Sequence, residues 1–255
     1  MIDVRIKSVL NAVLAGSRLA EEAVGNQILG RKGNLRDIVT QADIDICELL
    51  RKKLEVTGIP VVSEEGSALE DKTPEVFWVV DPIDGTVNYL NGLPIFTVSV
   101  GLVDRGEYSL GAVCAPGLNE LYFTLNSSRA LMNGRSFEHQ HSNVEDGLVS
   151  ATFPAKADQT FYDLFREVNE FTCGCLRTGS ASLNICWAAS GKLQAAYGFE
   201  AKLWDVAGAI AIAKSAGCEV VVRRKPNSLI IDYFVGSKKM VGKITEAAKN
   251  RGLFN

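Results

Sequence analysis

The hydrophobic pattern predicts helices at the N-terminus and strands directly after them. Residues 2–29 and 40–56 both carry apolar side chains at helical spacing, and the polar turn at 31–34 separates them. We therefore expect two amphipathic helices in this region. Valine-rich apolar runs bounded by turn residues follow, and they predict buried strands at 59–62, 76–80, 96–103, 108–114 and 121–125.

The pattern changes after a polar stretch at 137–146, beyond which short strands and helices alternate. Strands are predicted at 148–152, 174–176, 193–197, 219–222 and 229–234. Helices are predicted at 161–171, 181–189, 206–216 and 239–249. The chain is thus mixed α and β, with an N-terminal α+β lobe at 1–140 and a C-terminal α/β lobe at 141–255 that form one integrated unit.

No membrane segment or secretory signal is expected. Residues 85–103 carry no charge and are long enough for a bilayer, yet they include Asn88, Asn91 and Pro94. A short helix followed by a buried strand fits this stretch better. The first 24 residues mix acids and bases with apolar residues, unlike a signal peptide.

Composition and charge narrow the function classes. Apolar residues make up 47% and charged residues 22%, as in ordinary globular proteins. The net charge of −3, from 27 basic and 30 acidic residues, disfavours nucleic-acid binding through phosphate neutralisation. The six cysteines lack metal-ligand spacing and are interpreted as buried thiols of a cytoplasmic protein, and His139 and His141 as solvated loop residues.

The densest chemical signal lies at the end of the predicted strand 76–80. Asp81 and Asp84 flank Pro82, and Gly85 and Thr86 open the next short helix. Two carboxylates on one turn are costly to hold together unless a hard cation lies between them. Free amides at a helix start bind anions. A turn with an Asp cap is the simpler interpretation, but the preceding strand and the uncharged stretch beyond weaken it.

Three other segments supply acids that would complete such a site. Glu64 and Glu65 follow a predicted strand, although paired glutamates in loops are usually solvated. Asp43 comes three residues after Thr40, which is also the spacing of a capping box. Asp205 lies in the first turn of a predicted helix, where the helix dipole alone favours an acid. Each signal is weak by itself, and only their joint occurrence indicates a site.

Together these motifs resemble the inositol monophosphatase family, within the superfamily that also holds fructose bisphosphatases and bisphosphate nucleotidases. Asp81-Pro82-Ile83-Asp84-Gly85-Thr86 is similar to the family's first signature, and Trp204-Asp205-Val206-Ala207-Gly208 to its second. Glu64-Glu65, the segment from Asp37 to Asp43, and Gly179-Ser180-Ala181 match further family motifs in the same order. The resemblance implies an α+β, layered αβαβα sandwich of the sugar phosphatase type, with the active site between two lobes.

The resemblance also implies a lithium-sensitive phosphomonoesterase that uses two or three Mg²⁺ ions and acts as a homodimer. Glu64 and Thr86 would orient the attacking water, and Asp43 would hydrogen-bond Thr86. The metal ligands it implies are Glu64, Asp81, the carbonyl of Ile83, Asp84 and Asp205. The substrate-binding residues it implies are Asp84, Gly85, Thr86, Ser180, Ala181, Glu200 and Lys202.

The substrate is expected to be a small phosphorylated polyol or sugar, with inositol 1-monophosphate as the representative. Many inositol-specific members of the family it resembles carry a glutamate where this chain has Gly198, and Glu200 lies two residues further on. A fructose-1,6-bisphosphatase or a 3′(2′),5′-bisphosphate nucleotidase is the alternative, and it would need extra cations near Lys202 or Arg177. An inactive relative that serves as a binding partner is the non-enzyme alternative.

Overall fold

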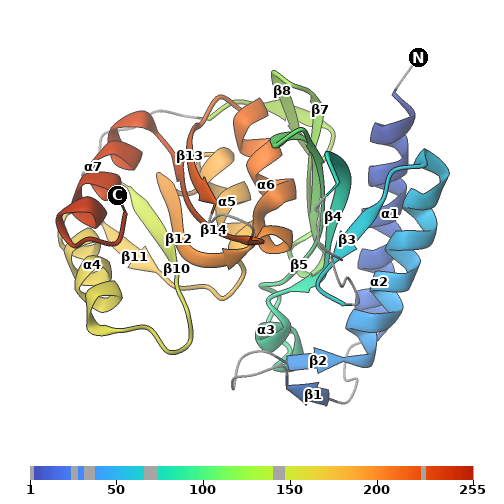
Figure 1. Cartoon of the computed structure of the whole chain (residues 1–255), viewed down its shortest axis with the longest axis horizontal. Coiled ribbons are helices and arrows are strands. Elements are labelled where there is room, and N and C mark those ends of the chain that lie inside the picture. The colour runs from blue at the N-terminus through green and yellow to red at the C-terminus, as the bar shows by residue number, and fades with distance from the viewer. Residues whose placement is uncertain are drawn as a thin grey trace.

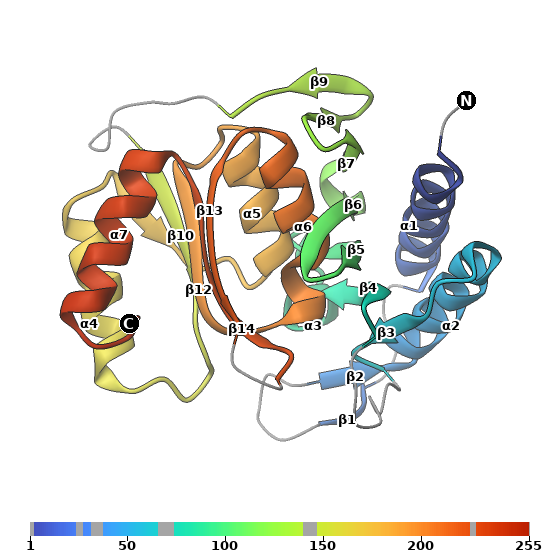
Figure 2. The same cartoon turned by 45° about the horizontal axis from the view of Figure 1, so that its top comes forward.

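A computed structural model describes residues 3–23, 28–31, 38–65, 74–139, 147–224 and 228–254. The elements stack in five layers, helices alternating with sheets, as Figure 1 shows from right to left. The turned view in Figure 2 shows the same order. The predicted α+β, layered αβαβα sandwich is confirmed.

The N-terminal sheet has seven strands in the order β3-β4-β5-β6-β7-β8-β9. Only β3 and β4 are parallel, and every other neighbouring pair is antiparallel. Its strands are β3 Val61–Ser63, β4 Val76–Asp84, β5 Thr97–Asp104, β6 Glu107–Ala115, β7 Glu120–Asn126, β8 Arg129–Met132 and β9 Arg135–Phe137.

The second sheet has five strands in the order β11-β10-β12-β14-β13. Its strands are β10 Leu148–Thr152, β11 Gly174–Leu176, β12 Ala195–Lys202, β13 Glu219–Arg224 and β14 Ile230–Gly236. A separate two-stranded sheet pairs β1 Ile28–Arg31 with β2 Ile38–Thr40. All strands of the seven-stranded sheet therefore precede residue 140 in the sequence, and all strands of the five-stranded sheet follow it.

The helices cover both sheets and fill the space between them. α1 and α2 pack on the outer face of the seven-stranded sheet, α5 and α6 lie between the sheets, and α4 and α7 cover the far face (Figure 1). Their bounds are α1 Val4–Glu22, α2 Gln41–Leu54, α3 Thr86–Leu90, α4 Gln159–Glu170, α5 Ala181–Ala189, α6 Leu203–Ser215 and α7 Lys238–Asn250. Two 3₁₀ turns complete the described elements, η1 Glu55–Thr57 and η2 Pro116–Leu118.

Glycines let α6 lie directly on the seven-stranded sheet. A Cβ at Gly111 of β6 would stand 2.0 Å from the carbonyl oxygen of Gly208 in α6, and one at Gly101 of β5 would stand 2.6 Å from the amide nitrogen of Gly208. Only hydrogen at all three positions permits this backbone approach. The contact places the first turn of α6, with Asp205, near the end of β4.

Several predicted elements match the structure, and the differences are local. Strand 174–176 and helix 181–189 have the predicted bounds. The helix predicted over 2–29 is wrong beyond Glu22, because residues 28–31 form a strand that pairs with 38–40. Strands β8 and β9 were not predicted. The uncharged stretch forms the short α3 and the buried β5, as expected.

Two side-chain predictions are corrected. His139 is buried rather than solvated, and its Nδ1 lies 2.8 Å from the carbonyl oxygen of Ala188. Cys173 is exposed, whereas Cys47, Cys114, Cys175 and Cys186 are buried as predicted. His141 and Asp37 lie outside the described residues. Within the described ranges, no helix combines the length and apolarity that a membrane crossing requires.

Candidate active site

A cleft of about 490 Å³ opens between the two large sheets. Most of the predicted site residues line it, although they come from segments far apart in the sequence. The predicted residues in its wall are Glu64, Asp81, Ile83, Asp84, Gly85, Thr86, Ala181, Glu200, Lys202 and Asp205. Asp43 and Ser180 do not line the cleft and lie buried behind it.

A β-bulge turns both signature carboxylates toward this cleft. In the β4–β5 ladder Asp81 pairs with Ser99 and Asp84 pairs with Thr97, so Pro82 and Ile83 lie opposite one residue. In a regular strand, residues three apart point to opposite faces. The extra residue cancels this alternation, and proline fits because it lacks the N–H that a ladder needs. Beside β4, the parallel strand β3 ends at Ser63 and delivers Glu64 to the same edge.

The negative charges of the carboxylates in the cleft repel one another, which favours their protonated forms. Burial raises the pKa of Asp81 well above its usual value, and the charges of Glu64, Asp84, Asp205 and Asp43 raise it further. Burial and the charges of Asp84 and Glu64 likewise raise the pKa of Asp205. In the metal-free protein these groups take up protons more readily than ordinary carboxyls. A bound divalent cation would compensate this repulsion between the carboxylates.

Helix α5 holds the carboxylate of Asp84 from the other side of the cleft. Asp84 Oδ2 accepts hydrogen bonds from Ser180 Oγ at 2.7 Å, Ser182 N at 2.8 Å and Ser182 Oγ at 2.5 Å, and Oδ1 accepts from Ala181 N at 3.2 Å. Burial raises the pKa of Asp84, and the hydrogen bonds from α5 oppose that rise. Three donors meet Oδ2 and one meets Oδ1, so Oδ1 keeps more capacity for a cation.

A second hydroxyl supports this arrangement from β5. Thr97 Oγ1 lies 2.5 Å from Ser182 Oγ, and both residues are fully buried. A serine hydroxyl has one proton, and the acceptor-only carboxylate of Asp84 receives it. Thr97 therefore donates to Ser182, which donates to Asp84. Sequence reasoning missed both residues: Ser182 directly follows the matched Gly-Ser-Ala motif, whereas nothing local marks Thr97.

The remaining predicted residues have structural partners as well. The Thr86 hydroxyl donates to the Ile83 carbonyl at 3.0 Å. Asp43 Oδ2 accepts from the Thr40 amide at 2.7 Å and from the Thr40 hydroxyl at 2.6 Å, which makes the capping box of α2. The predicted hydrogen bond between Asp43 and Thr86 and the predicted substrate contact of Ser180 stay predictions.

The donor set suits a hard divalent cation. Carboxylate and carbonyl oxygens are the ligands that Mg²⁺, Mn²⁺ and Ca²⁺ prefer, and the cleft supplies both kinds. The Ile83 carbonyl retains a lone pair beyond its bond to Thr86. Within the described residues, however, no group of three His, Cys, Asp or Glu side chains is arranged closely enough to hold a metal ion. Asp84 and Asp205 each accept a hydrogen bond from a backbone amide, Asp84 from Ser182 and Asp205 from Lys202.

Comparison with known proteins agrees with the fold and the motifs. The model of the inositol monophosphatase family matches residues 3–251, so the chain belongs to this family of phosphatases. It is 32% identical over 248 residues to a fructose-1,6-bisphosphatase/inositol-1-monophosphatase of Aquifex aeolicus, covering 93% of this chain and 92% of that protein.

Two further relatives carry a different name. The chain is 30% identical over 197 residues to the Nus factor SuhB of Vibrio cholerae, covering 76% of this chain and 70% of that protein. A solved structure of the extragenic suppressor protein suhB from Bartonella henselae superposes with a TM-score of 0.86 at 24% identity, covering 97% of this chain and 99% of that chain. At this identity, the similarity to the Bartonella structure supports the fold alone.

Proposed function

We propose that this protein is a Mg²⁺-dependent phosphomonoesterase that hydrolyses a small phosphorylated polyol or sugar, with inositol 1-monophosphate as the representative substrate. The observation that carries the proposal is the convergence of Glu64, Asp81, Asp84 and Asp205 on one cleft. The raised pKa values of Asp81, Asp84 and Asp205 mark negative charge that only a cation or protons can balance. Family membership supplies the reaction class.

The proposed metal ligands divide into two overlapping sets. Glu64, Asp81 and the Ile83 carbonyl would hold one ion, and Asp81, Asp84 and Asp205 would hold another, with a third ion as an option. Bound ions of this kind lower the pKa of a coordinated water and neutralise the leaving alkoxide. Glu64 and Thr86 orient the attacking water, and the amides of Gly85 and Thr86 hold the phosphate. Water adds to phosphorus, the ester P–O bond breaks, and the alcohol leaves with a proton.

The opposite wall of the cleft is suited to the alcohol part of the substrate. Glu200 and Lys202 are exposed there, and Ala181 adds a small apolar contact. Arg177 also lines the cleft, but its guanidinium stacks over the Phe153 ring at 3.8 Å and donates to the Phe153 carbonyl. Lys202 is therefore the better candidate for a second anionic group, as a bisphosphate substrate would require.

The names of two relatives support two alternative functions. The Aquifex relative's double name favours fructose 1,6-bisphosphate as a second substrate. The relative named a Nus factor keeps a non-catalytic binding role as the alternative of a different class. We also propose a homodimer, on the family resemblance, and a cytoplasmic location, on the interpretation of the cysteines as free thiols.

A phosphate-release assay separates these proposals. The substrates are inositol 1-phosphate, fructose 1,6-bisphosphate and a 3′,5′-bisphosphate nucleotide, each with millimolar Mg²⁺ and with EDTA. We expect Mg²⁺-dependent release, with inositol 1-phosphate among the good substrates. If no substrate releases phosphate at millimolar Mg²⁺, the enzyme proposal fails and the binding role gains support.

A further inference from the structure

Strand β12 contains a one-residue bulge where it enters the cleft. Gly198 pairs with Tyr233 and Ala201 pairs with Ile231, so Phe199 and Glu200 together lie opposite Asp232. Phe199 is buried, whereas Glu200 is exposed and lines the cleft. The bulge therefore delivers Glu200 to the substrate side of the site.

The bulge also changes which strand positions face the core. Ala196 packs in the core between the two sheets, and Ala201 packs in the same core although it lies five residues further on. Odd separations point to opposite faces in a regular strand. The extra residue places Ala201 on the same face of the strand as Ala196, so that Glu200 does not point into that core.

The backbone at the bulge requires stabilisation from outside the strand. Glu200 has φ +54°, in the left-handed region that residues other than glycine rarely adopt. Its amide donates a hydrogen bond of 2.9 Å to Asp232 Oδ1. A bond from an N–H to a carboxylate is among the stronger hydrogen bonds in proteins, so Asp232 offsets the cost of this conformation.

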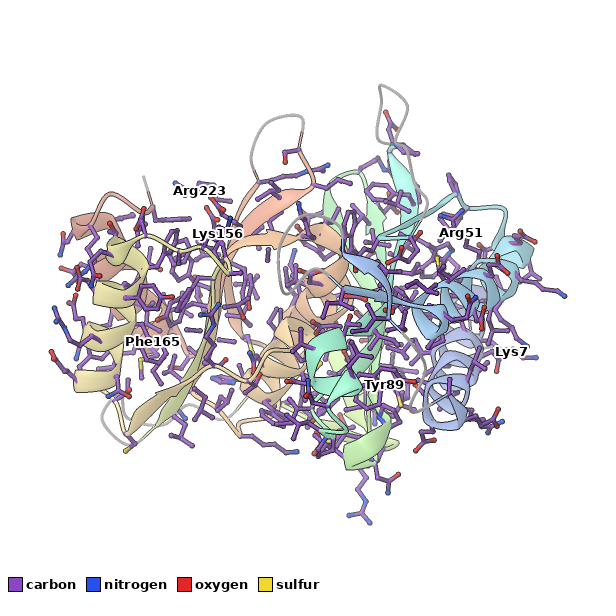
Figure 3. The ribbon with its side chains drawn as sticks, turned by 90° about the horizontal axis from the view of Figure 1, so that it is seen from below. Lys7, Arg51, Tyr89, Lys156, Phe165 and Arg223 are labelled. Carbon is purple, nitrogen blue, oxygen red and sulfur yellow. The ribbon has the colours of Figure 1, made fainter. Side chains whose placement is uncertain are left out.

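A second contact keeps Asp232 in place. Arg223 Nε and Nη2 both donate to Asp232 Oδ2, at 2.9 and 2.5 Å, which leaves Oδ1 to Glu200. The same Arg223 donates to the carbonyl of Leu253 at 2.7 Å and stacks over the ring of Phe254 at 4.6 Å. Arg223 is labelled in Figure 3. The C-terminal segment is thus linked to the bulge through two buried or half-buried side chains.

No other residue of β12 can supply a carboxylate to the cleft. Glu200 is the one acid in the strand. A Cβ at Gly198 would stand only 2.3 Å from Tyr233 Cε1, so any side chain at 198 would force the buried tyrosine ring to move. A glutamate at 198, as the family resemblance implies for many inositol-specific members, would therefore displace the Tyr233 ring.

We propose that Asp232 is a positioning residue that sets substrate preference. By holding the amide of Glu200, it keeps the Glu200 carboxylate directed at the hydroxyl groups of the substrate's alcohol part. This inference rests on the proposed function. Because the ladder continues beyond the bulge through Ala201 and Lys202, Asp205 keeps its place when the bulge loosens, and turnover is largely retained.

A double-mutant cycle tests the coupling. Asp232→Ala removes the acceptor, and Glu200→Gly removes the carboxylate while tolerating positive φ. For inositol 1-phosphate we expect each single variant to raise KM about tenfold with kcat nearly unchanged, and the double variant to be no worse than either. KM for phenyl phosphate, which has no hydroxyl groups on its alcohol part, stays unchanged. Glu219→Gln, an exposed acid on β13, is the matched control for lost charge.

Three outcomes would overturn the inference. The two substitutions act independently if their KM effects multiply, and the role is merely structural if phenyl phosphate suffers equally. Hydrogen exchange of residues 195–202 gives a readout that does not need activity, and we expect faster exchange of the Glu200 amide in Asp232→Ala. Unchanged exchange there refutes the inference even if wild type releases no phosphate. Should Asp232→Ala fail to fold, the double variant Asp232→Leu/Arg223→Leu removes the same acceptor without leaving the Arg223 charge without this partner. Asp232→Asn, which keeps an acceptor oxygen for the Glu200 amide, should restore the wild-type KM and exchange rate.

Discussion

Removing the hydroxyl of Ser182 tests whether α5 positions a metal ligand. In Ser182→Ala, Asp84 Oδ2 loses its 2.5 Å hydrogen bond, and the Thr97 hydroxyl loses its acceptor. A hydrogen bond to a charged group contributes about 1.5–3 kcal/mol. Three other donors continue to hold Asp84, so we expect a loss near the lower end of that range, about 2 kcal/mol in the free energy of unfolding.

The expected losses are measurable in two independent ways. For a protein of this size, about 2 kcal/mol corresponds to a fall in Tm of about 4–8 °C, measured without metal. Loosening a carboxylate that ligates metal typically weakens metal affinity by about 10-fold or more. Titration with Mn²⁺, followed by electron paramagnetic resonance, measures this affinity without reference to turnover.

Matched variants separate the hydroxyl's role from general repacking. Thr97→Val deletes only the second hydroxyl and should produce a smaller change in the same direction, whereas Thr97→Ser should restore wild-type behaviour. Ser150→Ala is the control, because Ser150 is fully buried in β10 and its hydroxyl has no hydrogen-bond partner among the residues that the structure describes. If Ser182→Ala leaves Tm and Mn²⁺ affinity at wild-type values, the positioning argument for α5 is refuted.

Four further predictions follow from the cleft and its surroundings. Asp81→Asn should lower Mg²⁺-dependent phosphate release at least about 100-fold, because it removes a ligand shared by both proposed ions, and near-normal release would contradict the metal assignment. Because the folded pKa values of Asp81 and Asp205 are raised, these two groups bind more protons in the folded protein than in the unfolded chain above a pH of about 4. Without metal, the free energy of unfolding should therefore fall as the pH rises from there toward neutrality, and saturating Mg²⁺ should reduce this slope; a flat profile in EDTA would refute the repulsion argument. Gly198→Ala should lower the free energy of unfolding by about 1–3 kcal/mol in a urea titration, because its Cβ would meet Tyr233, whereas Gly242→Ala, which meets no described atom within 4 Å, should not lower it. Lithium chloride should inhibit phosphate release, and insensitivity would argue against the metal arrangement that the family resemblance implies.

The pattern of apolar and polar residues predicts helices and strands well where one face of the element is buried in the core. Helix 181–189 and strand 174–176 were predicted with the observed bounds, and the alternation of helices and strands after 147 is correct throughout. The dipeptide Asn133-Gly134 is the sequence signal of the hairpin between β8 and β9, and both residues take the positive φ that a tight two-residue turn requires. The pairing of 28–31 with 38–40 had no such signal, because short strands of this kind depend on tertiary contacts.

The acids of the cleft were predictable from sequence because their motifs are local. A carboxylate directly after a buried strand, or in the first turn of a helix, is recognisable within a few residues. The motifs around Asp81 and Asp205 therefore predicted both the family and the kind of site. Glu64 followed from the same reasoning.

Only the tertiary structure decides how those acids are held and which substrate groups they meet. Oδ2 of Asp84 is engaged by a helix almost 100 residues away, and the bulge that carries Glu200 depends on Asp232, which faces it from another strand. Gly198 is required by the ring of Tyr233 across the ladder. Each of these contacts depends on register between distant strands, which the spacing of neighbouring residues does not specify. The sequence by itself determined the family and the acids that line the cleft, and the packing of the two sheets decided the orientation of those acids.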